Sequence, residues 1–225
     1  MAPLNIKETE FFSGFTESDF DEVMPYFANI SLNKKEMIFS EGENSGWLYI
    51  VTEGKVKITK LSHDGKEIIL ELIQPGELFG AVAVFKGIPY PANAIAMERS
   101  KVLRISRKGL LKLLDRFPHL MLTLTSIIGE RIKNSYETLK NIALERVESR
   151  VAALLLKLAD KTCGEEGKGT HIDMKLTKQD IADMVGTTVE TSIRTISKFK
   201  KEGLITESDG KIIILDRANF ELYNL

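Results

Sequence analysis

The 176–205 stretch, LTKQDIADMVGTTVETSIRTISKFKKEGLI, constrains the fold of this chain more than any other segment. Its first half predicts a short amphipathic helix, with Thr177 as its N-cap, Asp180 completing a capping box and Gly186 ending it. Thr187 and Thr188 then supply the expected N-cap of a second helix. Two short helices joined by a tight turn around a glycine predict a helix-turn-helix.

The second of these helices is expected to have one buried and one exposed face. Apolar residues at helical spacing predict a buried face that consists of Val189, Ile193, Ile196 and Phe199. The exposed face carries Glu190 and Arg194 near the N-terminal end, where a helix in the major groove reaches base edges. Glutamate can accept a hydrogen bond from cytosine N4, and arginine can donate two to guanine. The alternative is an ordinary surface helix with an i, i+4 ion pair.

A β-hairpin signal follows the second helix. In the run LITESDGKIIILD, the turn residues Ser208, Asp209 and Gly210 separate two β-prone segments. A hairpin in this place forms the wing of a winged helix, and Lys211 at its tip is placed to contact phosphate. The sequence therefore predicts double-stranded DNA as a partner. The predicted DNA-binding residues are Thr177, Thr188, Val189, Glu190, Thr191, Arg194, Lys198, Lys201 and Lys211.

The overall charge of the chain does not by itself favour nucleic acid. The net charge is −1, with 31 Lys and Arg against 32 Asp and Glu, so DNA affinity has to come from local clustering and from a dimer. The single cysteine, Cys163, excludes an intramolecular disulfide and a four-cysteine iron–sulfur cluster, and it indicates a cytoplasmic location. Neither a transmembrane run of about 18 apolar residues nor a signal peptide is present, so no membrane association is expected.

The N-terminal half of the chain has a different pattern. After a short helical lead-in at 8–28, β-prone runs alternate with glycine turns from about Ile30 to Ser106. Many short strands at such spacing predict an antiparallel β-roll. The 225 residues are enough for two domains with separate cores. The fold class expected is therefore α+β.

A long helix is expected between the two regions. A short helix from Arg107 to Arg116 precedes Pro118, which is tolerated at the start of a second helix that runs to about Ile142. Apolar residues on this helix fall on or beside heptad positions, which predicts a two-fold dimer. The predicted dimer interface consists of Met121, Leu124, Ile128, Ile132, Ser135, Leu139 and Ile142. The expected domains are a sensing β-roll at 1–117, a dimerisation helix at 118–143 and a DNA-binding domain at 144–225.

In their order and spacing, the pieces IFSEGE, LYIVTEGKVKI, PGELFG and LTKQDIADMVGTTVETSIRTISKFKKEGLI resemble the CRP/FNR family of bacterial transcription regulators. The resemblance covers nearly the full length. It implies a cyclic-nucleotide-binding-type β-roll, a dimerisation helix and a winged helix that binds an inverted-repeat operator as a homodimer. In activating relatives a loop that corresponds to about 160–171 touches RNA polymerase, which implies that enzyme as a further partner.

The departures from the family concern the phosphate cassette, whose first half is kept here as Gly76, Glu77, Leu78, Phe79 and Gly80. Cyclic-nucleotide-binding relatives have a second half like P-R-[ST]-A, but here Tyr90 stands in the place of the arginine and Pro91 in that of the hydroxyl residue. The family's purine-contacting pair falls at Ser135 and Tyr136. Cyclic AMP is therefore not expected to bind, since a buried phosphate needs a paired cation. The candidate effector pocket comprises Gly76, Glu77, Leu78, Phe79, Tyr90, Pro91, Asn93, Ser135 and Tyr136, with Val84 and Phe85 nearby.

The recognition helix also departs from the cyclic-AMP receptor pattern. Val189, Glu190 and Thr191 resemble the FNR-like branch, which prefers TTGA-like half-sites. Ile193 stands where that branch usually has serine, which leaves one base of the half-site undetermined.

Several alternatives for the sensing chemistry and for the function stay open. The effector is a small apolar or redox-related molecule, haem, or no ligand at all. His119 is the best candidate for an axial haem ligand among His63, His119, His171, Cys163 and the methionines. An enzyme on a cupin-like barrel would need clustered metal ligands, and three scattered histidines argue against a metal site and against an enzyme. A ligand-binding module attached to another protein is the third possibility.

Overall fold

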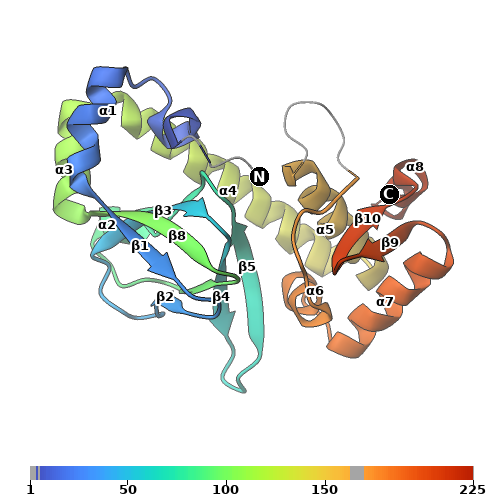
Figure 1. The fold of residues 1–225 in the computed structure, drawn as a ribbon. Coiled ribbons are helices and arrows are strands. Elements are labelled where there is room, and N and C mark those ends of the chain that lie inside the picture. The colour runs from blue at the N-terminus through green and yellow to red at the C-terminus, as the bar shows by residue number, and fades with distance from the viewer. Residues whose placement is uncertain (1–3, 5, 163–169, 225) are drawn as a thin grey trace. The chain divides into compact units, whose positions relative to one another are not determined.

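The computed structural model describes residues 4, 6–162 and 170–224 (Figure 1). It divides into two compact units, Met1–Arg131 and Ile132–Leu225. The helix α4, His119–Leu144, begins one residue after Pro118 and contains the boundary between the units. Each unit is described by itself.

The N-terminal lead-in is built from short helices that carry aromatic side chains into the core. They are η1 (Ile6–Glu8), η2 (Glu10–Phe12), α1 (Glu17–Val23) and η3 (Met24–Tyr26). Thr16 and Asp19 form a reciprocal capping box that starts α1. Phe12 is buried and makes edge contacts with Phe20 and Phe27, which attaches the lead-in to the first strand.

The predicted β-roll is present as two four-stranded antiparallel sheets. The first sheet has the order β1 (Phe27–Leu32), β8 (Ser100–Ser106), β3 (Trp47–Glu53) and β6 (Leu78–Phe79). The second has the order β2 (Met37–Phe39), β7 (Asn93–Ala96), β4 (Val56–Leu61) and β5 (Glu67–Ile73). Hydrogen bonds between Ser62 and Lys66 close the predicted hairpin between β4 and β5.

The core of this unit lies on both faces of the first sheet. Helix α3 (Arg107–Arg116) packs against β3 and β8, so Leu48 and Ile50 are buried under it while Tyr49 and Val51 are buried inside the roll. Because both faces of β3 are buried, its sequence is a continuous apolar run and does not alternate between apolar and polar residues. The bounds of α3 agree with the prediction. The short helix α2 (Ala81–Lys86) follows β6.

The second unit is the predicted winged helix. Its elements are α5 (Val147–Thr162), α6 (Lys178–Val185), α7 (Val189–Lys201), β9 (Ile205–Ser208), β10 (Lys211–Ile214), α8 (Arg217–Glu221) and η5 (Leu222–Asn224). Asp209 and Gly210, at φ 52° and 78°, turn the wing with the two positive φ angles of a type I′ hairpin. Phe199 of α7 is fully buried and packs edge-on against Phe220 of α8 at 5.0 Å.

The α+β fold class is thus confirmed. Most of the loop that the sequence associates with RNA polymerase lies outside the described residues, as does Cys163. Among the described helices none is long and apolar enough to cross a membrane.

Candidate DNA interface and sensing domain

The caps of the helix-turn-helix follow the sequence prediction. The Thr177 hydroxyl accepts from the Asp180 amide at 3.0 Å, and the Asp180 carboxylate accepts from the Thr177 amide at 2.9 Å. Gly186 ends α6 in the left-handed region at φ 66°, and the Thr188 hydroxyl accepts from the Thr191 amide at 3.3 Å. The hydroxyls of Thr177 and Thr188, both predicted to bind DNA, are therefore engaged in helix caps. They position the two helices before any DNA contact.

The prediction for the buried face of α7 is confirmed only in part, since Val189 is half-buried and Ile193 is exposed. Ile196 and Phe199 are buried as predicted, but Ile193 is 47% exposed. The buried positions are instead completed by the small residues Ser192 and Thr195. Helix α7 packs against α6 and α5, and small side chains at buried positions allow close packing. Ile193 therefore shares the outward surface with the charged readout candidates.

The outward surface at the start of α7 carries Glu190, Ile193 and Arg194. The pKa of the Glu190 carboxyl is lowered by a hydrogen bond with its own backbone amide and by one with the Thr188 hydroxyl. Glu190 is therefore a carboxylate at neutral pH and can act as a hydrogen-bond acceptor. Arg194 stands one turn further along the same surface and is exposed. An acceptor and a bidentate donor are thus presented together at the N-terminal end of α7.

Several basic residues of the helix-turn-helix form ion pairs with acidic residues. Lys200 pairs with Glu207 of β9 at 2.6 Å, and Lys178 at the start of α6 pairs with the same carboxylate. Burial raises the pKa of Glu207, but the hydrogen bonds with the two lysines prevail and leave it lowered. These pairs connect the wing to both helices of the motif.

Two of the lysines predicted to contact DNA have protein partners in the structure. Lys211 is bonded to Asp173, so it stands at the start of β10 as a paired cation instead of a free one beside the turn. Lys198 lies over the Tyr223 ring, with its Nζ 5.2 Å from the ring centroid and 3.9 Å from Glu148. Both sets of partners come from segments that are distant in the sequence, and the contacts of these lysines with DNA stay predictions. Lys201 is exposed at the end of α7.

We expect Thr177→Ala to lower the free energy of unfolding by about 1 kcal/mol, because it removes the side chain that caps α6. The loss should be seen as a lower denaturant midpoint in a urea titration. Ser197→Ala, at an exposed position on α7, is the matched control and should change the midpoint little. An unchanged midpoint for Thr177→Ala would mean that the capping box contributes nothing to stability.

In the N-terminal unit, Tyr90 is the residue that the resemblance places at the position of a phosphate-binding arginine. Its ring is 2% exposed and stacks on Phe39 with a centroid distance of 3.7 Å and an interplanar angle of 10°. Its hydroxyl donates to the Trp47 carbonyl at 2.6 Å and accepts from the Trp47 amide at 3.1 Å. Burial raises the pKa of the Tyr90 phenol, so it stays neutral. The residue is therefore a satisfied part of the core and offers no positive charge to an anion.

An aromatic cluster of Phe39, Tyr49, Phe79 and Tyr90 surrounds this position. The rings of Tyr49 and Phe79 stack at 5.1 Å, and burial raises the pKa of the Tyr49 phenol. Gly80, at φ 79°, lies directly beneath the cluster: a Cβ there would come within 3.3 Å of the Tyr90 ring and 3.2 Å of the Trp47 carbonyl. The cluster thus packs onto the cassette backbone itself.

The other predicted pocket residues have separate roles. Glu77 accepts from the Gln74 amide at 2.8 Å, and Asn93, which is buried, accepts from the Glu41 amide at 2.8 Å. Leu78 belongs to the core, as does Val84, whereas Pro91 and Phe85 are exposed. Gly76 takes a positive φ of 91° in the turn before β6.

Arg131 contacts the phosphate-cassette segment, and the sequence alone did not predict this contact. It lies on α4, and its guanidinium pairs with Glu71 of β5 at 3.1 Å and also donates to the Leu78 carbonyl. A cation is therefore present beside the cassette, but it already has a carboxylate partner. The separation of about 50 residues between Arg131 and the cassette left no local signal that could have identified it.

The predicted dimer stripe on α4 requires one correction. Leu124 is 6% exposed and belongs to the core of its own domain. The residue one position later, Thr125, is exposed. Large apolar side chains that remain exposed on the helix are Met121, Leu122, Ile132, Tyr136, Leu139, Ile142 and Leu144. Tyr136 is thus a surface residue of the protomer, and Ser135 beside it is exposed as well.

The three histidines form no metal centre in the described part of the chain, where no group of three metal-ligating side chains occurs. His119, the haem-ligand candidate, packs edge-on against Phe15 at 5.3 Å at the start of α4. Its imidazole is therefore held by aromatic contacts in the lead-in, away from the aromatic cluster of the cassette.

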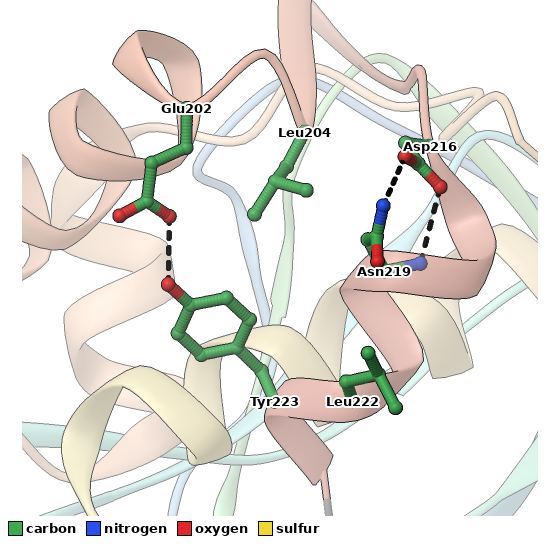
Figure 2. A pocket seen from close by; sticks show the side chains of 6 residues that line it. All are labelled: Glu202, Leu204, Asp216, Asn219, Leu222 and Tyr223. Carbon is green, nitrogen blue, oxygen red and sulfur yellow. Dashed lines mark hydrogen bonds between the residues drawn. The ribbon is translucent and has the colours of Figure 1, made fainter.

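A shallow pocket of about 380 Å³ lies near the C-terminus of the second unit (Figure 2). It is lined by Glu202, Leu204, Asp216, Asn219, Leu222 and Tyr223. The polar groups that Figure 2 shows there are already paired, since Tyr223 donates to Glu202 at 2.6 Å and Asp216 caps α8 through Asn219. The pocket therefore offers little polar chemistry to a ligand.

Comparisons with known proteins agree with this geometry. Residues 29–117 match the cyclic nucleotide-binding domain family, and residues 149–223 match the Crp-like helix-turn-helix domain family. The chain is 30% identical over 203 residues to the cAMP-activated global transcriptional regulator CRP of Haemophilus influenzae, covering 87% of this chain and 88% of that protein. It is 26% identical over 205 residues to the CRP-like cAMP-activated global transcriptional regulator of Mycobacterium tuberculosis, covering 91% and 92%.

The fold is also similar to that of a solved structure. FixK2 from Bradyrhizobium japonicum matches with a TM-score of 0.80 at 22% identity, over 88% of this chain and 98% of that one. Together with the two domain matches and the curated relatives, this similarity extends over nearly the whole chain. The chain belongs to the CRP/FNR family and is a DNA-binding transcription regulator.

Proposed function

We propose that the protein acts as a homodimer on an inverted-repeat operator with TTGA-like half-sites, in the manner of the FNR-like branch. The observation that carries the proposal is the pair Glu190 and Arg194, both exposed at the N-terminal end of α7. An ionised carboxylate and an arginine in this place can read a cytosine and a guanine in neighbouring base pairs. Val189 before them, in place of an arginine, supports the TTGA-like reading.

The dimer is supported by the apolar surface of α4. Met121, Ile132 and Leu139 are exposed in the protomer although they are large and apolar. A contiguous apolar stripe along one helix is typical of a surface that is covered by a partner. A second copy is the partner that an inverted repeat requires, because each half-site then receives one recognition helix.

Selection from a randomised DNA library tests the proposal. The bound sequences should contain two copies of one half-site in inverted orientation, separated by about one helical turn. Recovery of single, unpaired sites would contradict the dimeric mode of binding. RNA polymerase is a further proposed partner, to be tested by transcription from a promoter that carries the selected operator.

The effector is proposed to be different from cyclic AMP. Titration calorimetry should detect no binding of cyclic AMP at millimolar concentration, which means a binding free energy weaker than about −4 kcal/mol. The physical reason is Tyr90, whose ring fills the site and whose hydroxyl is already bonded to Trp47. A cAMP-activated relative, titrated under the same conditions, is the positive control. A micromolar dissociation constant accompanied by tighter DNA binding would contradict this proposal.

A second candidate is a regulator that is competent for DNA without any ligand. The stacked cluster of Phe39 and Tyr90 favours it, because the rings stand where an effector would have to enter. Mass and absorption spectra of the purified protein distinguish the candidates. A retained small molecule or a haem absorption band would favour a sensor, whereas a bare protein that binds its operator would favour the ligand-free regulator.

A further inference from the structure

Two neighbouring residues of α7, Ser192 and Ile193, show the reverse of the usual burial, because the polar one is buried and the apolar one is exposed. Ser192 is fully buried, and its hydroxyl has no hydrogen-bond partner among the described residues, whereas Ile193 is 47% exposed. Burial of an unpaired hydroxyl costs free energy, and exposure of an isoleucine forgoes the gain from burying it. A single exposed apolar residue is ordinary on a protein surface, but stability alone does not account for this reversed pair.

The place of Ile193 on the helix indicates what its side chain meets. It lies three residues after Glu190 and directly before Arg194, and all three are exposed. Three residues correspond to about 60° around a helix, so Ile193 shares the outward surface with both readout candidates. When the N-terminal end of α7 lies in the major groove, the isoleucine faces base edges as well.

The chemistry of the major groove leaves one standard partner for an apolar side chain there. Base edges present hydrogen-bond donors and acceptors, and an isoleucine packed against them would leave these groups of the bases without partners. The exception is thymine, whose 5-methyl group projects into the groove and makes apolar contacts with side chains.

We propose that Ile193 is a specificity-determining residue that contacts the 5-methyl group of a thymine in each half-site. The inference rests on the proposed operator binding and adds the identity of one base and the group by which it is recognised. It also explains why an apolar side chain is maintained in water at this position of the free protein. Glu190 and Arg194 read their bases by hydrogen bonds, while Ile193 reads by shape and apolar contact.

The experiment replaces thymine by deoxyuridine, one position at a time in both half-sites of the selected operator, and measures binding to the full-length protein. Removal of one methyl contact should weaken binding about fourfold per half-site at one thymine position. Ile193→Ala should bind the unmodified operator more weakly and should lose this discrimination between thymine and uracil. Ile193→Val, which keeps a β-branched apolar side chain, is the matched control and should retain most of it.

The outcomes separate the inference from the proposed function. The proposed role of Ile193 is wrong, and operator recognition stands, in either of two cases. In the first, the protein prefers one operator sequence but uracil weakens binding at no thymine position. In the second, uracil weakens binding of the Ile193→Ala variant as much as that of the wild type. If the protein has no sequence preference, both fail. Because Ile193 is exposed, its variants should unfold at the same temperature as the wild type. A lower unfolding temperature in every variant, together with loss of the discrimination between thymine and uracil, would indicate a structural role instead.

Discussion

Replacing Leu139 with glutamate should convert the protein to a monomer that no longer binds its inverted-repeat operator. Leu139 is 64% exposed in the protomer, so the substitution leaves the fold of its own domain intact. At a two-fold seam it would bury two unpaired carboxylates against an apolar surface, at a cost of about 3–5 kcal/mol for dimer formation. Light scattering should show half the mass, and a gel shift should show lost operator binding.

Leu144→Glu is the matched control for this prediction. Leu144 is 74% exposed on the same helix but lies about 140° around it from Leu139, away from the proposed seam. This variant should remain dimeric and keep its operator affinity. If Leu139→Glu stays dimeric with normal binding, or if both variants dissociate alike, the seam along α4 is wrongly placed.

Replacing Arg194 with alanine should weaken binding to the cognate operator by about 1–3 kcal/mol per half-site and relax the preference at one guanine. The side chain is exposed at the start of α7, so its loss removes a bidentate base contact and leaves the fold unchanged. Glu190→Ala should relax the preference at an adjacent cytosine. The measurement is binding to a randomised operator library at two salt concentrations.

Lys201→Ala provides the contrast, because Lys201 lies at the C-terminal end of α7, which in the proposed docking is near the DNA backbone. A phosphate contact carries no sequence information, so its loss should weaken binding to all sequences alike and reduce the salt slope by about one unit. Lys200 is a poorer position for this test of phosphate contact, because it already forms an ion pair with Glu207. Full sequence preference in the Arg194→Ala variant would show that α7 is docked differently.

The features that the sequence predicted correctly are those whose cause is local. The caps at Thr177 and Thr188, the turn at Asp209 and Gly210 and the end of α6 at Gly186 depend on neighbouring residues and on backbone angles that few residues adopt. Patterns of short strands and of two short helices were therefore sufficient for the fold class and for the helix-turn-helix.

The tertiary structure decided which face of a helix is buried and which charges are paired. Helical spacing groups residues on one side but does not say what covers that side, and this is why Leu124 and Ile193 were assigned to the wrong surfaces. The pairs Arg131 with Glu71 and Lys211 with Asp173 join segments far apart in the chain, where no sequence spacing predicts contact.

The sequence alone thus determined a winged helix that presents Glu190 and Arg194 at the start of its second helix, because local backbone preferences and amphipathic patterns specify both. Only the tertiary structure showed that Tyr90 is buried, stacks on Phe39 and bonds to Trp47, and that Ile193 is exposed beside Glu190 and Arg194. The physical reason is that packing and hydrogen bonding between distant segments depend on how the whole chain folds.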